Sequence, residues 1–191
     1  MRWVSRVSNA IASVEKRLVT LLAAALVLLI LLNIVTRAAG AAIFWVDELA
    51  IYTMIWMALI AASLMLKLRI GVAVTLMTNL LPRGFRRGIA RLVDAILLFF
   101  ALVLLVLSWQ WYDPVALIKS GFDLDIFRQT TFKFIYSEPT NTLGIGKFWV
   151  WLAVPIMAIA MSVHAVANLL EGPPEESVSG KDDTDPLGSN L

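Results

Sequence analysis

Long apolar runs dominate the pattern of hydrophobic and polar positions along this chain. Four runs stand out, over residues 18–36, 49–66, 92–109 and 148–170. Each is close to the roughly 20 apolar residues that a transmembrane α-helix needs, and none alternates with the period of two that is typical of a membrane β-strand. The pattern predicts an all-α integral membrane protein whose four transmembrane helices form one domain over residues 1–170.

The segments outside these runs have patterns of their own. Residues 1–17 carry apolar positions at helical spacing between basic residues, which predicts an N-terminal amphipathic helix that lies at the membrane surface or leads straight into the first span. About 35 residues separate the third span from the fourth, so we expect a long loop there. Residues 171–191 are rich in Pro, Gly, Ser and acid, which predicts a tail that is disordered on its own.

Basic and aromatic residues predict how the helices are oriented. With both termini in the cytoplasm (N-in/C-in), 11 of the 16 lysines and arginines would lie inside and 5 outside, as the positive-inside rule requires. The acidic tail would then be cytoplasmic and the long loop periplasmic. In this orientation an aromatic belt marks the outer ends of the helices, formed by Trp45, Trp109, Trp111, Trp149 and Trp151.

Composition narrows the class of function. The chain is 60% hydrophobic with a formal net charge of +2, which is too small to suggest a nucleic-acid partner. It contains no cysteine and a single histidine, His164, which excludes disulfides and a bis-histidine haem within one chain. The sequence shows no phosphate loop, no HExxH motif and no nucleophile–base constellation, so we expect neither enzymatic activity nor a cofactor.

Polar residues within the spans could mark a transport path, because such groups are costly in a bilayer. We interpret Asp94 as a solvated or ion-paired end residue near Arg87 and Arg91. His164 is interpreted as a hydrogen-bonding residue between helices or at the interface rather than a proton relay, and Pro155 is expected to bend the fourth helix. These residues form no line across the bilayer, so a self-contained transport path is not expected.

Charged residues at the ends of the spans are expected to have structural roles. Asp47 and Glu48 begin the second span, where acidic residues cap a helix and interact with its dipole. Glu48 is also a candidate to pair with Arg37 across the short hairpin between the first two spans. A basic cluster at helical spacing precedes and enters the third span, and we expect it to contact anionic lipid headgroups: Arg83, Arg86, Arg87 and Arg91.

The long loop contains aromatic residues that a solvent-facing loop does not need. We expect them to pack on the membrane surface or on a partner protein: Phe127, Phe132, Phe134 and Tyr136. The acidic residues of the loop do not have the spacing of an EF-hand, so a metal site is not expected at Asp113, Asp123 and Asp125.

One set of positions has an order and spacing typical of a known family. Its members are Arg37 at the end of the first span, Trp45, Glu48 and Trp56 in the second, then Lys67, Arg69 and Gly71, and finally Leu81, Pro82, Arg83, Arg86 and Arg87. Together with the four spans, they make most of residues 15–170 resemble the small membrane subunit (DctQ-like) of tripartite ATP-independent periplasmic (TRAP) transporters.

This resemblance implies a function. In that family the small subunit packs beside a large elevator-type permease subunit, a periplasmic solute-binding protein delivers a carboxylate-type solute, and sodium drives uptake. The chain would then be a non-catalytic scaffold in the bacterial inner membrane. The resemblance implies partner contacts or structural roles for Arg37, Trp45, Glu48, Trp56 and Arg69, beside the loop aromatics.

Two departures from the family leave a second interpretation open. Many members carry a histidine and then an acidic residue after the second span, where this chain has the polar-poor stretch from Gly71 to Thr75. The loop between the third and fourth spans is also longer than is usual. The alternative is a structural accessory subunit recruited to a photosynthetic or respiratory complex, where it would contact subunits of an electron-transfer complex and shape a quinone path.

Overall fold

The structure, a computed structural model, describes residues 2–69 and 83–172, with side chains described over residues 3–69 and 88–172. Within these ranges it is built from helices, with one isolated β-bridge between Pro139 and Gly146. The helices are α1 (Arg2–Ala38), α2 (Phe44–Leu68), α4 (Arg83–Tyr112), α5 (Pro114–Lys119), α6 (Leu124–Thr131), α7 (Lys147–Trp151) and α8 (Ala153–Glu171). The segment from Gly71 to Thr75, the Leu81–Pro82 step and residues 173–191 of the acidic tail lie outside the described residues.

Four stretches of helix are long and apolar enough to cross a membrane: α1, α2, α4 and the α7–α8 pair. The predicted all-α architecture with four spanning helices is therefore confirmed at the level of length and composition. All four stretches extend beyond the predicted spans, the fourth by a single residue at each end, because apolar composition follows the hydrocarbon layer while a helix continues until its backbone is interrupted.

Helix α1 decides between the two arrangements expected for the N-terminus. It is one continuous helix of 37 residues, so the amphipathic segment leads straight into the first span. Residues 2–38 contain neither glycine nor proline, and either of these would weaken or interrupt a helix. The helix ends just before Gly40, which has a φ of +71°, the left-handed conformation that commonly follows a helix C-terminus.

The fourth span is irregular one turn before Pro155, the residue expected to bend it. Helix α7 ends at Trp151 and α8 begins at Ala153, and the intervening Leu152 keeps a right-handed helical backbone with φ of −55° and ψ of −20°. Pro155 explains the position of this irregularity, since it has no N–H for the carbonyl of Trp151 and its ring displaces that carbonyl. The flanking bonds persist, with the Leu152 N–H on the Phe148 carbonyl at 3.1 Å.

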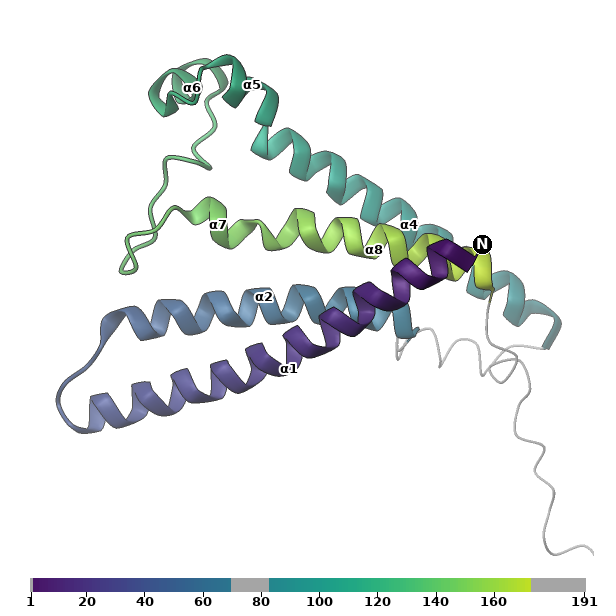
Figure 1. The fold of residues 1–191 in the computed structure, drawn as a ribbon, viewed down its shortest axis with the longest axis horizontal. Helices are drawn as coiled ribbons and strands as arrows, with labels where there is room; N and C mark the ends of the chain where they lie inside the picture. The colour runs from purple at the N-terminus through teal and green to yellow at the C-terminus, as the bar shows by residue number, and fades with distance from the viewer. Residues whose placement is uncertain (1, 70–82, 173–191) are drawn as a thin grey trace, which may run out of the picture.

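Helix α8 is the centre of the bundle (Figure 1), and it packs against α1, α2 and α4. In its apolar stretch 44% of the residues are buried inside the protein, against 0% in α1. Small residues allow helices to approach closely in a membrane, and α8 buries five alanines. The apolar core joins α2, α4 and α8 through Leu66, Ala101, Met157, Met161 and Ala165.

The beginning of α1 and the end of α8 lie at the same end of the bundle (Figure 1). The turn between α1 and α2 and the segment between α4 and α7 lie at the opposite end. We call the first the terminal end and the second the loop end. An even number of spans requires this arrangement, which agrees with both termini lying on one side of the membrane.

We predict that enlarging Ala101 will destabilise the bundle. Ala101 on α4 is 0% exposed, so Ala101→Leu forces extra methyl groups into the contact with α8 and should lower the free energy of unfolding by about 1–3 kcal/mol. Ala95→Leu is the matched control, because Ala95 is exposed on the same helix. Unfolding of the purified protein in detergent measures both, and equal stability of the two variants would contradict this packing.

Candidate functional site: polar clusters at both ends of the bundle

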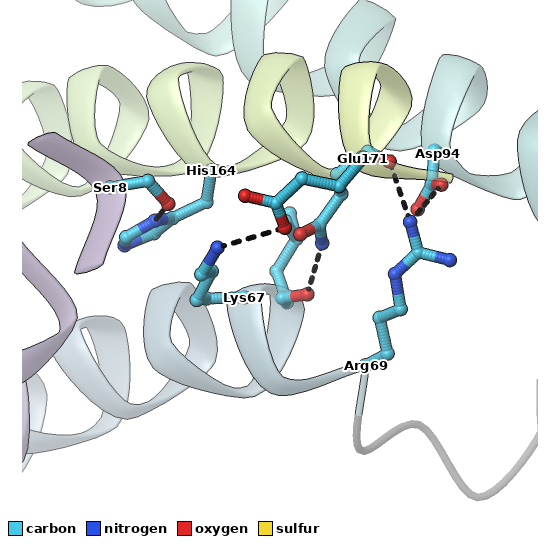
Figure 2. A network of polar contacts seen from close by, with 8 residues as sticks. Ser8, Lys67, Arg69, Asp94, His164 and Glu171 are labelled. Carbon is cyan, nitrogen blue, oxygen red and sulfur yellow. Dashed lines mark hydrogen bonds and ion pairs between the residues drawn. The ribbon is translucent and has the colours of Figure 1, made fainter. Parts of the chain in front are cut away.

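The first polar cluster lies at the terminal end, where Arg69 joins three helices (Figure 2). Arg69 follows the last residue of α2 with a φ of 54°. Its Nη2 donates to Asp94 Oδ2 on α4 at 2.8 Å and to the Asn168 carbonyl on α8 at 2.7 Å. Asn168 Nδ2 in turn donates to the Leu66 carbonyl on α2 at 3.0 Å. We call these four residues the Arg69 cluster.

The Arg69 cluster satisfies charges that are largely withdrawn from solvent. The side chain of Asp94 is 5% exposed and that of Arg69 is 20% exposed. Burying a charge without a partner is costly, whereas a paired and hydrogen-bonded charge is tolerated. The prediction of an ion-paired Asp94 is confirmed, and the partner that the structure shows is Arg69, which the sequence analysis did not name for it. Arg91 is exposed, and the side chain of Arg87 lies outside the described residues.

A second ion pair extends the connection between α2 and α8 at this end. Lys67 Nζ lies 3.5 Å from Glu171 Oε2, close to the Arg69 cluster (Figure 2). The lysine side chain is 10% exposed and the glutamate 41%, so this pair sits between the cluster and solvent. A long, half-exposed pair of this kind contributes less to stability than the buried pair behind it.

His164 ties α1 to α8 through a buried hydrogen-bonded chain. Its Nδ1 lies 2.8 Å from Ser8 Oγ, and its Nε2 lies 3.0 Å from Glu15 Oε2. Ser8 and His164 have no exposed surface, and Glu15 is 6% exposed. The interpretation of His164 as a hydrogen-bonding residue between helices is confirmed. These contacts hold the N-terminal part of α1 across α8.

Ser8, His164 and Glu15 also form a nucleophile–base–acid arrangement, which the sequence analysis did not expect. The three residues lie on two helices, with 156 positions between Ser8 and His164. The sequence offered one indication of this arrangement. Ser8 and Glu15 are seven positions apart, which places both on one face of a helix. Ser8 and His164 are fully buried, so the hydroxyl faces the inside of the bundle, where its bond to His164 links α1 to α8.

At the loop end, Glu48 fastens the segment before α7 to the first turns of α2. Its Oε1 accepts from the Tyr52 hydroxyl at 2.6 Å and from the Asn141 N–H at 2.7 Å. Its Oε2 accepts from the Thr142 N–H and hydroxyl, each at 2.6 Å, and from the Leu143 N–H at 3.1 Å. Five donors around one carboxylate that is 8% exposed make a firm attachment, because bonds to a charged acceptor are the stronger kind.

Arg37 has a different partner from the one proposed in the sequence analysis. It forms an ion pair with Asp47, and Glu48 is occupied by the loop. Asn33 donates to the same aspartate and accepts from Arg37 Nε at 2.8 Å. The expected ion pair across the hairpin between α1 and α2 is therefore present, but Asp47 supplies the carboxylate instead of Glu48. The Arg37 side chain is 58% exposed, so this pair lies at the protein surface.

An aromatic cluster fills the space between the end of α4, α6 and α7. Tyr136 packs edge-on against Tyr112 and Phe127, and tilted against Phe148. The Tyr112 hydroxyl donates to the Phe148 carbonyl at 2.8 Å. Burial raises the pKa of Tyr136 above its ordinary value, with a contribution from the Asp113 carboxylate. The phenol therefore stays protonated at neutral pH.

The four predicted loop aromatics thus divide into two pairs. Phe127 is 1% exposed, so the prediction that it packs on a membrane or a partner is wrong, while Tyr136 is half-buried beside it and its predicted outer contact stays a prediction. Phe132 and Phe134 are 80% and 51% exposed and remain available. Residue type alone could not separate the pairs, because both contain large aromatic side chains.

The remaining predicted positions occupy different surroundings. Trp45 is exposed at the start of α2, while Trp56 lines an apolar groove of about 230 Å³ together with Leu22 and Trp149. The side chains of Arg83, Arg86 and Arg87 lie outside the described residues, although all three belong to α4. The three loop aspartates each have a partner: Lys133 for Asp113, the first N–H groups of α6 for Asp123, and Arg128 for Asp125.

Comparison with known proteins identifies what the chain is similar to. The profile of the family described as "Tripartite ATP-independent periplasmic transporters, DctQ component" matches residues 26–173, more than half of the 191 residues. A curated relative from Vibrio cholerae serotype O1 is described as "C4-dicarboxylate TRAP transporter small permease protein DctQ". It is 28% identical over 124 residues, which cover 64% of this chain and 53% of the relative. The chain thus spans about half the length of that relative.

We predict that Glu48→Gln will release the segment before α7. A glutamine can accept through one oxygen only, and its amide group would meet backbone donors, so the amides of Asn141, Thr142 and Leu143 lose partners. Hydrogen–deuterium exchange of these amides should rise at least several-fold. Asp47→Asn is the control, since it breaks the pair with Arg37 and leaves these bonds in place. Unchanged exchange in Glu48→Gln would contradict the attachment.

We also predict that Arg69→Met will destabilise the protein strongly. It leaves the Asp94 carboxylate buried without its cation, and removing one partner of a buried pair typically costs about 3–5 kcal/mol. Arg128→Met is the matched control, because its pair with Asp125 is exposed and exposed pairs contribute only about 0–1 kcal/mol. Unfolding in detergent compares the two. A similar loss of stability in both variants would show that the Arg69 cluster is not the dominant connection.

Proposed function

This chain belongs to the DctQ family, the DctQ component of tripartite ATP-independent periplasmic transporters, and we propose that it is the small subunit that scaffolds a large elevator-type permease. In this proposal it is a non-catalytic part of a secondary transporter for sodium-coupled uptake of carboxylate-type solutes. The family match carries the proposal. The relative named for C4-dicarboxylates supports the solute class.

The distribution of exposed apolar surface supports a scaffolding role. None of the apolar stretch of α1 is buried inside the protein, and α4 exposes a further row of large side chains that includes Phe99, Phe100 and Val103. Helices associate in a membrane through close van der Waals packing. Two long, unpaired helical faces therefore offer a large permease subunit an extensive surface on which to pack.

The positions of the polar groups support a solute path in the partner rather than in this chain. In the described part of the chain, the buried charged and histidine side chains gather at the two ends of the bundle: Glu15, Asp94 and His164 at the terminal end and Glu48 at the loop end. Each has a hydrogen-bond or ion-pair partner inside the chain. A transporter exposes polar groups near the middle of the bilayer, so we place the solute path in the permease.

The proposed setting is the bacterial inner membrane, with both termini in the cytoplasm. The 11 to 5 division of basic residues supports this orientation. Arg83, Arg86, Arg87 and Arg91 would then lie near the anionic headgroups of the cytoplasmic leaflet. The loop end would face the periplasm, where a solute-binding protein delivers its cargo to the complex.

We predict that a permease will co-purify with the chain. Native membranes are solubilised in mild detergent, the complex is captured through a C-terminal tag, and partners are identified by mass spectrometry. We expect one larger multi-span protein in stoichiometric amount. Vesicles containing both proteins and the solute-binding protein should take up solute when a sodium gradient is imposed, and vesicles lacking this chain should lose most of that uptake.

Two matched variants identify the contacting face. Ala24→Trp and Ala95→Trp place a bulky side chain on the exposed faces of α1 and α4, and the one at the interface should reduce co-purification while the chain still folds. If pigment-binding or respiratory subunits are captured instead of a permease, the proposal is wrong and the electron-transfer alternative takes its place.

A further inference from the structure

Two phenylalanines of the segment between α4 and α7 occupy backbone conformations that aromatic residues rarely adopt. Phe122, in the turn between α5 and α6, has a φ of 63°, and Phe132, directly after α6, has a φ of 55°. Glycine or asparagine is the usual residue at such left-handed positions. Strain of this kind persists where the side chain has a use that outweighs it.

Folding of this segment does not account for the two side chains. Phe122 is 68% exposed and Phe132 is 80% exposed, so neither contributes much buried surface. Phe127, at 1% exposure, supplies the aromatic contact between α6 and Tyr136. At two positions, therefore, a strained backbone carries a phenylalanine whose side chain lies outside the protein core. This combination points to an apolar environment outside the protein.

The position of these residues relative to the spans indicates which environment that is. Helix α4 ends with Trp109 and Trp111, 62% and 40% exposed, and exposed tryptophans mark the membrane interface. Helix α5 begins at Pro114 immediately afterwards, and Figure 1 shows α5 and α6 folded together beyond the end of α4. Val115 and Ile118 of α5 are also exposed, so apolar surface continues from the span onto this hairpin.

The charges of the hairpin are arranged so that it can approach a bilayer at low cost. Asp113 pairs with Lys133 at 2.6 Å, and Asp125 pairs with Arg128 at 2.9 Å. The remaining acidic residue, Asp123, accepts from two backbone N–H groups at the start of α6. Moving a charged side chain out of water costs less free energy when it already has an ion-pair or hydrogen-bond partner. Lys119 is exposed at the end of α5, where a long cationic side chain can reach lipid phosphates.

We propose that residues 113–134, which we call the α5–α6 hairpin, bind the membrane surface at the loop end of the bundle. Phe122 and Phe132 enter the boundary between headgroups and acyl chains, as the apolar side chains of interfacial helices do. The lipid bilayer is the occupant of this surface. The hairpin thereby holds the outer end of α4 at a set depth, independently of whether a permease covers the rest of the helix.

The chain has no cysteine, so single-cysteine variants of the full-length protein can test the proposal cleanly. Phe122→Cys and Phe132→Cys are labelled with an environment-sensitive fluorophore and reconstituted into phosphatidylcholine–phosphatidylglycerol vesicles. Gln129→Cys is the matched control, since Gln129 is an exposed residue on the face of α6 that carries Asp125. Lipids with a quencher near the headgroup should quench the labels at 122 and 132 several-fold more than the label at 129. Aqueous iodide should show the opposite order.

Equal quenching at the three positions by both reagents would overturn the proposal. It would also be wrong if the labels at 122 and 132 became shielded only when a co-purified protein was added, because the surface would then be a protein-docking site. Labelling of folded protein is verified by its unfolding temperature, and Phe132→Leu, which retains an apolar side chain, should preserve vesicle contact of a label at 122. Capture of a permease is a separate measurement, so failure here leaves the proposed function standing.

Discussion

A charged side chain within a bilayer has to find its partners inside the protein, and this constraint organises the bundle. Arg69 meets it at the terminal end by binding Asp94 and the Asn168 carbonyl, which brings α2, α4 and α8 together. Glu48 meets it at the loop end with donors from Tyr52 and from the segment before α7. Between the two, the helices are held by apolar contacts that have little directional preference. The polar ends therefore determine which helices are neighbours.

Fixing the helices at their ends leaves their long faces available. Helix α8 is the most buried, with 44% of its apolar stretch inside the protein, whereas α1 and α4 keep most of their large side chains on the surface. A DctQ subunit with an open arrangement can place these faces against another membrane protein or against lipid, and its internal polar contacts remain intact in either case.

Much of the fold could be predicted from the sequence, because apolar runs of about 20 residues have few structural solutions in a membrane. Helix ends were harder to place: α1 continues through its basic N-terminal segment, and Pro155 divides the fourth span at Leu152. The partners of the charged residues could not be predicted. Asp94 lies 25 positions from Arg69 along the chain, whereas Arg87 and Arg91 are much nearer in sequence and were the natural choice.

Hydrogen bonds to backbone groups are even harder to predict from a sequence than ion pairs between side chains. Glu48 accepts from the N–H groups of Asn141, Thr142 and Leu143, and any residue other than proline carries such a donor. Arg37 pairs with Asp47 and not with Glu48 because residues 141–143 already occupy the Glu48 carboxylate, and the sequence did not indicate that this segment packs there. Similarly, Phe127 and Phe132 belong to one run of aromatics, and only the fold separates the buried residue from the exposed one.

The continuity of α1 has a mechanical consequence. Its 37 residues correspond to about 55 Å of helix at 1.5 Å per residue, well beyond the roughly 30 Å of a hydrocarbon layer. Ser8 and Glu15 attach one end to His164, and Arg37 attaches the other to Asp47. A rod fastened at both ends cannot tilt at one membrane surface without moving the other. If a neighbouring subunit displaced α1, the ends of this helix would therefore move on both sides of the membrane at once.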